Sequence, residues 1–265
     1  MNKRIAHRKA AVDGCLLAAV GCCIILLAAY LWREVPKARE GIDSSVCLAN
    51  QSNFHLEMLN YHDKYHRLPP AYIADEHGRP MHSWRILLLE TSRDPDAVAI
   101  YKAYRFDEPW DGPHNRLLAD KMPRFYACHS DVRRRGEPRP NGLSNYVLVT
   151  GPGTLFPGKE SASLDDIKDI HRDTILVAET LPGVPWLKPQ DLEVDRMSFR
   201  INDPARPSIS SAHPNCSIVA LLDGRVERLP ETTTPEALRD MILLTPADGA
   251  GKNGAGEAAG AGKRP

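Results

Sequence analysis

The sequence predicts an α+β protein in which a single N-terminal transmembrane helix continues into a long helix and is followed by β-strands. Three observations predict this class. Residues 14–32 carry no charge, apolar residues then recur at helical spacing as far as Pro69-Pro70, and short β-branched segments replace that pattern from Asn145 onward. The chain of 265 residues is long enough to bury a core of its own.

The apolar segment GCLLAAVGCCIILLAAYLW, residues 14–32, predicts a membrane anchor. A helix of this length spans the roughly 30 Å of a bilayer's hydrocarbon layer. A cleaved signal peptide has a shorter apolar core and small residues at the cut site, whereas the bulky Leu27 lies two positions before the best candidate cut, after Ala29. We therefore expect an uncleaved span in the inner (cytoplasmic) membrane.

The flanks of this segment predict its orientation. The N-terminal flank has four basic residues and the other flank three, a modest bias that places residues 1–13 in the cytoplasm. Residues 33–246 are then expected to form an extracytoplasmic domain, and the Gly/Ala-rich residues 247–265 a disordered tail.

The remaining helices are predicted by spacing and by prolines. The helix after the anchor is expected to end at Pro69-Pro70, and Pro36 is expected to kink or interrupt it. Residues 81–92 could be a strand or a short helix, and helix is favoured. Shorter helices are expected within residues 94–110, with Asp94 as the N-cap before Pro95, and within residues 113–128, where the helix ends near Met122-Pro123.

Strands are predicted where β-branched and aliphatic residues lie between turn-forming residues, at 145–151, 174–180 and 217–229. A last helix is expected over residues 233–244, with Thr234 as its N-cap and Pro235 at the first helical position.

Composition and cysteine spacing restrict the possible functions. Lys+Arg and Asp+Glu both number 34, so the zero net charge gives no basic surplus for nucleic-acid binding. Three of the six cysteines lie in the apolar segment. At most one disulfide can form among Cys47, Cys128 and Cys216, and spacing alone does not choose it. No CxxC or Cys/His spacing indicates a zinc site.

The stretch SSAHPNCSIVALLDGRVERLP, residues 210–230, contains a histidine ten positions before an Asp-Gly pair. Asp223-Gly224 is a preferred pair for a type I′ turn, so the stretch predicts a β-hairpin. At about 3.3 Å per residue, His213 and Asp223 end up roughly 30 Å apart, too far to share a metal ion or a proton. Each is therefore expected to have a separate structural role.

Other polar groups give weaker signals. His62 and His66 have the i,i+4 spacing of helical metal ligands, but they also suit the negative end of a helix. Asp107, Asp111 and His114 lie on a turn-rich loop that is a weak candidate for calcium binding. Glu179 is the only acid placed by a core strand, and it is interpreted as a hydrogen-bonding anchor. No nucleophile elbow or protease cysteine is present, so neither catalytic residues nor a cofactor are predicted.

Blocks along residues 35–246 resemble a large bacterial family, domain of unknown function 1559, abundant in planctomycetes. The blocks include HSWRILLLE, DEPWDGPHN, MPRFYACHSD, NYVLVTGPGTLFPG and ISSAHPNCSIVALLDGRVERLPETT. His213, Asp223 and Gly224 match the family's H-x9-DG signature. The resemblance implies a type IV pilin- or pseudopilin-like fold, with a long N-terminal helix packed on an antiparallel sheet. Since the family's activity is not established, it implies no catalytic residues.

The resemblance also bears on the cysteines and on processing. Cys47 and Cys128 match the family's usual cysteines, whereas Cys216 is an extra thiol, so the resemblance favours a Cys47–Cys128 disulfide. The prepilin cleavage motif is missing from AAVDGCLLAAVG, and no acid lies within the apolar helix. These departures argue against cleavage by a prepilin peptidase and against filament assembly.

The leading hypothesis is a non-enzymatic, pseudopilin-like envelope protein anchored by one membrane span, acting in a secretion- or pilus-related assembly. Its expected partners are the membrane, further copies of itself or other envelope proteins, and not nucleic acid. One alternative is a membrane-tethered module that binds a glycan, calcium or a protein. A less favoured alternative is a hydrolase that depends on Glu179 or His213.

Overall fold

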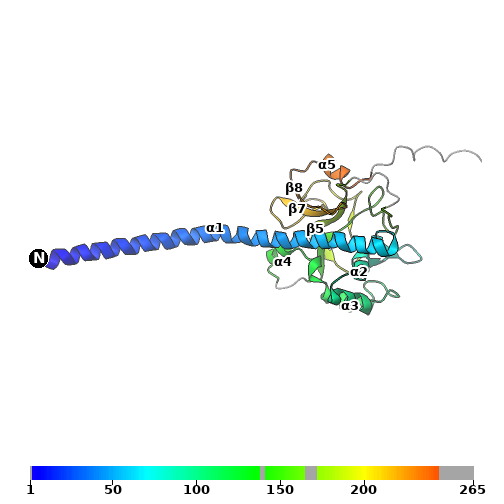
Figure 1. Ribbon diagram of the computed structural model, residues 1–265, viewed down its shortest axis with the longest axis horizontal. Coiled ribbons are helices and arrows are strands. Elements are labelled where there is room, and N and C mark those ends of the chain that lie inside the picture. The colour runs from blue at the N-terminus through cyan, green and yellow to red at the C-terminus, as the bar shows by residue number, and fades with distance from the viewer. Residues whose placement is uncertain (1, 138–140, 165–171, 245–265) are drawn as a thin grey trace, which may run out of the picture. The chain divides into compact units, whose positions relative to one another are not determined.

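The computed structural model describes residues 2–137, 141–164 and 172–244, with side chains from Val20 onward. The tail predicted at residues 247–265 lies outside these ranges. The chain divides into two compact units, Met1–Val46 and Cys47–Pro265. The first unit consists of helix, and the second contains the strands and the remaining helices (Figure 1).

Helix α1 runs from Asn2 to Tyr65 and so begins in the first unit and ends in the second. The expectation that Pro36 could interrupt it is wrong, because the helix is continuous through this residue. A proline removes one backbone hydrogen bond, a loss that the many other bonds of a 64-residue helix can sustain. The helix ends before Pro69-Pro70, as predicted, and His66 follows it with a positive φ of 57°.

The described part of α1 also bears on the predicted span. Among the residues whose side chains are described, no helix is both long and apolar enough to cross a membrane. The side chains of residues 14–19, with which the predicted span begins, lie outside the described part.

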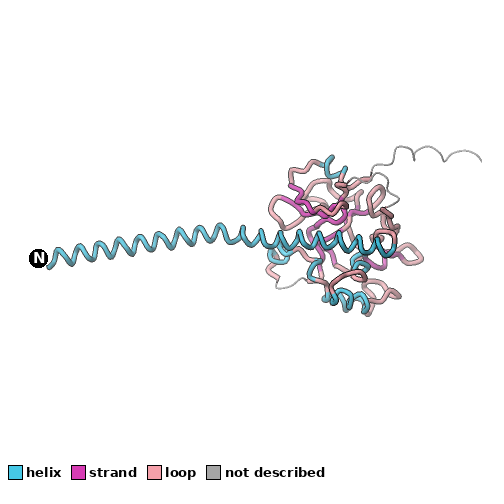
Figure 2. Tube along the Cα trace, viewed as in Figure 1, coloured by secondary structure: helices cyan, strands magenta, loops and turns pink. Residues whose placement is uncertain are grey.

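The second unit is built on a four-stranded antiparallel sheet in the order β3-β5-β7-β8. Figure 2 shows these strands among many loops. Their bounds are Leu143–Val147 for β3, Ile175–Pro185 for β5, Cys216–Leu221 for β7 and Val226–Pro230 for β8. Two small ladders accompany the sheet: β1 (Tyr72–Ala74) pairs antiparallel with β2 (Pro80–Ser83), and β4 (Val149–Thr150) pairs parallel with β6 (Leu192–Glu193).

The shorter helices agree in part with the sequence predictions. They are α2 (Trp84–Leu88), α3 (Pro95–Ala103), α4 (His129–Arg134) and α5 (Pro235–Asp240), with 3-10 turns at Asn115–Lys121 and Arg124–Tyr126. Residues 81–92 comprise the end of β2, the helix α2 and the turn that follows it. Both predicted caps are confirmed: Asp94 accepts a hydrogen bond from the N–H of Asp96, and Thr234 from that of Ala237.

The sheet has a hydrophobic cluster on each face, because consecutive strand residues point to opposite sides. On one face, α1 and α2 pack on the strands with Phe54, Met58, Trp84, Tyr146, Val177 and Ala220. The other cluster contains Val147, Ala178, Val219, Leu221 and Leu229 together with Leu238 of α5. The strand β7 is therefore covered on both faces, in keeping with its continuous apolar run SIVALL, residues 217–222.

The hairpin predicted at 217–229 is confirmed, but its turn is not of type I′. The strands β7 and β8 pair antiparallel from Cys216 opposite Pro230 to Ala220 opposite Val226. A type I′ turn needs positive φ at both central residues, and here Gly224 has a φ of 92° while Asp223 is not among the residues with positive φ. Instead, the Asp223 carboxylate accepts the N–H of Arg225, at 3.0 Å, and so stabilises a longer turn.

A buried cluster of two cysteines, a glutamate and a histidine

Four buried side chains meet on the α1 side of the sheet, within the second unit. They are Cys47 on α1, Cys128 immediately before α4, Glu179 in β5 and His213 in the loop before β7. Their exposed fractions are 0%, 1%, 0% and 3% respectively. We call this group the Cys/Glu/His cluster.

Hydrogen bonds to the backbone fix two members of the cluster. The side-chain oxygen of Asn145 accepts the N–H of Cys128 at 2.9 Å, which ties the start of α4 to strand β3. The Oε2 atom of Glu179, in β5, accepts the N–H of Ile218, in the neighbouring strand β7, at 2.9 Å. Glu179 therefore makes the anchoring hydrogen bond that the sequence predicts, and it also contacts the other members of the cluster.

The loop before β7 brings the histidine into the cluster. Its backbone N–H donates to the hydroxyl of Ser211, at 3.1 Å, and Asn215 turns the chain with a φ of 58°. The Nδ1 atom of His213 lies 3.2 Å from the hydroxyl of Ser130. This contact orients the ring so that Nε2 faces the other three members of the cluster.

The cluster is compact. The Sγ atoms of Cys47 and Cys128 are 3.4 Å apart, and Nε2 of His213 is 3.6 Å from Sγ of Cys128 and 3.5 Å from Oε1 of Glu179. One donor atom from each of the four residues lies within 4.8 Å of all the others. Oε1 of Glu179 is buried and has no hydrogen-bond donor among the described residues.

The short distances and the burial perturb the acid–base properties of the cluster. Contact with Cys128 lowers the pKa of Cys47 to about 4, and His213 acts in the same direction while burial opposes it. The thiol–thiol contact and burial both raise the pKa of Cys128. Burial also raises the pKa of Glu179, against the effect of His213. The pKa values of the two thiols are therefore shifted in opposite directions.

Two thiols, an imidazole and a carboxyl group can serve either as metal ligands or as a nucleophile with its base. A nucleophile must touch its substrate, whereas Cys47 and Cys128 are only 0% and 1% exposed. Burial therefore favours the use of these groups as ligands or as a structural link.

The sequence predictions relate to this cluster in different ways. The structure brings Cys47 and Cys128 together as free thiols, so the disulfide between them stays a prediction. His213 and Asp223 have separate partners, as predicted, since the Asp223 carboxylate pairs with Arg225 Nε at 2.7 Å. The cluster as a whole was missed. Its members are scattered along the chain and show no regular spacing. The sequence singles out each of them separately but contains nothing that connects all four.

The calcium candidates are not brought together. Asp107 and Asp111 are exposed, and the Nε2 atom of His114 lies 2.8 Å from the carbonyl oxygen of Ala103. In the part of the chain that the structure describes, the Cys/Glu/His cluster is the one group of three or more such residues within metal-binding range. The nearby Glu108 instead accepts the backbone N–H groups that follow it in the loop.

Among the described residues, His62 and His66 do not belong to any group of three or more potential metal ligands, and a third histidine of the same helix, His55, has a structural contact. His55 lies beside the hairpin, with Nε2 3.1 Å from the carbonyl oxygen of Leu222. Its ring is also close to Gly224, where an added Cβ would lie 3.1 Å from Cε1. This residue therefore links α1 to the turn that carries the Asp-Gly pair.

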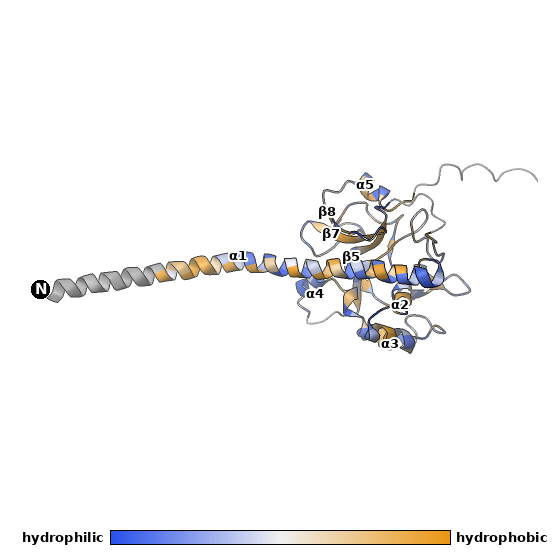
Figure 3. Ribbon diagram, in the orientation of Figure 1, coloured by the Kyte–Doolittle hydropathy of each residue, from blue (hydrophilic) through white to orange (hydrophobic). Residues whose placement is uncertain are grey.

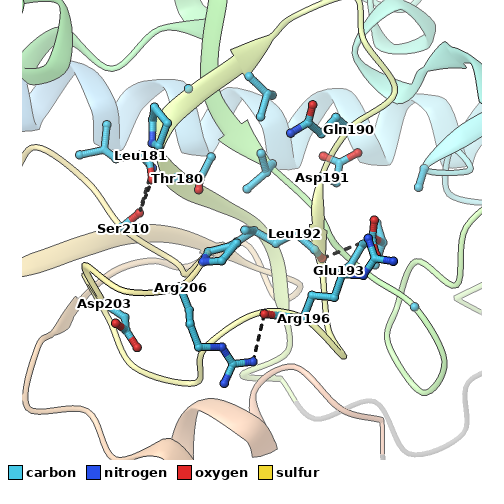
Figure 4. A pocket seen from close by; sticks show the side chains of 18 of the residues that line it. Thr180, Leu181, Gln190, Asp191, Leu192, Glu193, Arg196, Asp203, Arg206 and Ser210 are labelled. Carbon is cyan, nitrogen blue, oxygen red and sulfur yellow. Dashed lines mark hydrogen bonds and ion pairs between the residues drawn. The ribbon is translucent and has the colours of Figure 1, made fainter.

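A cavity of about 1370 Å³ lies next to the cluster, and Figure 4 shows part of its lining. Strand β6, the end of β5 and the loop 202–207 form its walls. Arg206 donates to the carbonyl of Arg196 at 3.0 Å, and Ser210 accepts the N–H of Leu181 at 2.8 Å (Figure 4). His213 contributes to the lining as well, so the cavity and the cluster share one residue.

Comparison with known proteins gives one match. No curated protein and no solved structure is significantly similar to the chain. A family model described as "Protein of unknown function (DUF1559)" matches residues 36–187, which include three of the four cluster residues. Because the match covers more than half of the chain, this protein belongs to the DUF1559 family of proteins of unknown function.

Proposed function

We propose that the chain is a non-enzymatic envelope protein, anchored by one span in the cytoplasmic membrane with its main domain on the outer side. In this proposal the domain is pseudopilin-like and takes part in a secretion- or pilus-related assembly. Its partners are the membrane and either further copies of itself or other envelope proteins.

The observation that carries the proposal is the uninterrupted helix α1. It joins the uncharged sequence at 14–32 to a segment, Cys47–Tyr65, that packs on an antiparallel sheet. In Figure 3 the stretch of α1 that follows the grey residues is mostly hydrophobic, while the part in the second unit alternates between hydrophobic and hydrophilic residues. An apolar segment followed by an amphipathic one is the arrangement expected of a helix that leaves a membrane and then covers a sheet.

Membrane anchoring can be tested with the full chain expressed in bacteria with an N-terminal tag. We expect it to stay in the membrane after an alkaline carbonate wash. Protease added to spheroplasts should digest the domain and spare the tag. Replacing Ile24 and Leu27 by arginine should release the protein, since each arginine at mid-span costs about 2.5–3.5 kcal/mol.

The matched control places two arginines at Ile42 and Leu56, which are exposed positions on the same helix beyond the span. This variant should remain in the membrane. The anchoring proposal would be wrong if carbonate removed the unaltered chain, or if the domain resisted protease until the spheroplasts were lysed.

Assembly can be tested with the cysteines of the anchor. Cys15 and Cys22 are seven residues apart and share a helical face, where a parallel neighbour could approach. With Cys216→Ser, gentle oxidation of membranes and alkylation before lysis, assembly of the chain with further copies of itself predicts a ladder of cross-linked species on a non-reducing gel. Replacing Cys15 and Cys23 as well leaves one thiol in the anchor and should limit the products to dimers. If the Cys216→Ser variant gave no ladder, assembly of the chain with copies of itself would be contradicted, whereas the anchoring proposal would be unaffected.

A second candidate function is a membrane-tethered module that binds a small polar ligand such as a glycan. The cavity of about 1370 Å³ favours it, because charged residues and apolar residues both line it. An oligosaccharide that fits should stabilise the full chain by about 2.7 kcal/mol at a hundred times its Kd, measured as a rise in Tm. Ala205→Trp, within the cavity, should abolish this rise, and Ala103→Trp, at an exposed position on α3, should not. No response to a broad oligosaccharide panel would count against this function.

A further inference from the structure

We propose that the Cys/Glu/His cluster binds one zinc ion, with Cys47, Cys128, His213 and Glu179 as its four ligands. Thiolate sulfur, imidazole nitrogen and carboxylate oxygen are the donors that zinc takes in proteins, and four protein ligands are typical of a closed structural site. Two thiolates also select against magnesium and calcium, which prefer oxygen.

The distances between the donor atoms suit this ion. Zinc bonds sulfur at about 2.3 Å and nitrogen or oxygen at about 2.0–2.2 Å, so the donors of a tetrahedral site lie roughly 3.3–3.8 Å apart. The contacts between Cys47 and Cys128, Cys128 and His213, and His213 and Glu179 are 3.4, 3.6 and 3.5 Å. These values correspond to edges of such a tetrahedron, and the remaining donor pairs lie within 4.8 Å.

The surroundings of the cluster are arranged as for metal ligands. The second nitrogen of the His213 ring contacts Ser130, as the outer nitrogen of a zinc-bound histidine usually contacts a polar group. One oxygen of Glu179 is fixed by a backbone N–H, while the other is buried without a hydrogen bond and has Nε2 of His213 at 3.5 Å. A buried carboxylate oxygen that faces two sulfur atoms needs a counter-charge, and a divalent cation would provide it.

The competing arrangement is the disulfide that the family resemblance favours. A disulfide has its sulfur atoms about 2.05 Å apart and needs no histidine or glutamate beside it. The observed separation of 3.4 Å and the convergence of His213 and Glu179 on the pair fit a metal centre better. The two arrangements exclude each other, so one experiment can distinguish them.

A zinc ion here would have a clear structural effect. It would connect α1, the start of α4, the centre of β5 and the loop before β7, which are far apart in sequence. In small domains, the free energy of metal binding contributes directly to folding. The inference is independent of the proposed function, because a zinc site is compatible with either an anchored or an unanchored chain.

The test uses the full chain in detergent with Cys15, Cys22, Cys23 and Cys216 replaced by serine, so that Cys47 and Cys128 are the only thiols. After reduction and removal of metal, cobalt is added as a spectroscopic substitute for zinc. We expect about one equivalent to bind, with a sulfur-to-cobalt charge-transfer band in the near ultraviolet that zinc then abolishes. Zinc should also raise the Tm of the reduced protein.

Variants of the ligands provide the specific readout. Cys47→Ser should abolish the charge-transfer band or weaken it severely, and His213→Gln should lower cobalt affinity by at least about tenfold. His55→Gln is the control, because this histidine also lies next to the sheet but outside the cluster, and it should leave affinity unchanged. Tryptophan fluorescence verifies folding. If Cys47→Ser does not fold, the comparison of His213→Gln with His55→Gln carries the test.

Two results would overturn the inference. One is a folded, reduced chain that shows no charge-transfer band with cobalt. The other is protein from cells alkylated at lysis in which peptide mapping finds Cys47 joined to Cys128. Failure of membrane anchoring would affect neither measurement, so the two proposals can fail separately.

Discussion

Replacing Phe54 by alanine is expected to lower the free energy of unfolding by about 3–5 kcal/mol, the usual cost of removing a fully buried aromatic side chain. Phe54 is 1% exposed, and its ring lies 4.9 Å from that of Tyr146 and 5.3 Å from that of Tyr126, between ring centroids. The rings of Trp84 and Phe125 lie at 6.0 Å. These partners come from the sheet and from other helices, so they cannot all move to fill the cavity left by the ring.

The measurement is urea denaturation of the full chain in detergent, followed by tryptophan fluorescence, because Trp84 and Trp186 are fully buried. Leu56→Ala is the matched control, since Leu56 lies on the same helix but is 46% exposed. It should change the free energy of unfolding by less than about 0.5 kcal/mol. Equal losses in the two variants would mean that α1 does not pack on the sheet through Phe54.

Replacing Asp191 by alanine is expected to destabilise the protein by a similar amount, about 3–5 kcal/mol, for an electrostatic reason. Its carboxylate lies 2.9 Å from Nη2 of Arg85, whose side chain is fully buried. The same oxygen accepts the indole N–H of Trp84 at 3.0 Å and the backbone N–H of Leu148 at 2.9 Å. Without it, the buried guanidinium would lose its counter-charge, and the two N–H donors would lose their acceptor.

Burial raises the pKa of Asp191 even though Arg85 acts to lower it, so desolvation offsets much of the attraction within this pair. The expected loss therefore reflects the partners left behind rather than a large net gain from the pair. Asp191→Asn keeps an oxygen acceptor for the N–H donors and should recover part of the loss in the same denaturation experiment.

Arg196→Ala is the control, because it breaks a pair with Glu193 whose side chains are 74% and 53% exposed. Exposed pairs contribute about 0–1 kcal/mol. A result in which Asp191→Ala cost no more than Arg196→Ala would show that the Arg85 guanidinium finds another partner or reaches solvent.

Much of the fold could be predicted because its elements follow local rules. Helix caps at Asp94 and Thr234, the hairpin at 217–229 and the strand at 174–180 depend on neighbouring residues and on the period of the apolar pattern. The prediction of a type I′ turn was wrong because the Asp223 carboxylate accepts the N–H of Arg225 and stabilises a longer turn. The interruption expected as one possibility at Pro36 does not occur, because the helix on both sides of this residue supplies many other backbone hydrogen bonds.

The candidate site could be predicted only in pieces. The sequence singles out Glu179 and His213, and the family resemblance pairs Cys47 with Cys128, but nothing in the sequence indicates that these four residues lie together. They meet because the register of β5 against β7 places Glu179 opposite the start of β7, where the loop carrying His213 arrives. A shift of one residue in that register would turn Glu179 to the other face of the sheet.

The sequence by itself therefore determined the α+β class, most of the helices and strands, and membership of the family, since these depend on composition, spacing and the order of motifs. The tertiary structure alone decided that two cysteines, a glutamate and a histidine share one buried space, and that Asp107, Asp111 and His114 are not such a group among the described residues. The physical reason is that a ligand set depends on distances of 3–4 Å between side chains. Such distances arise only when sheet register and helix packing bring together residues that are remote along the chain.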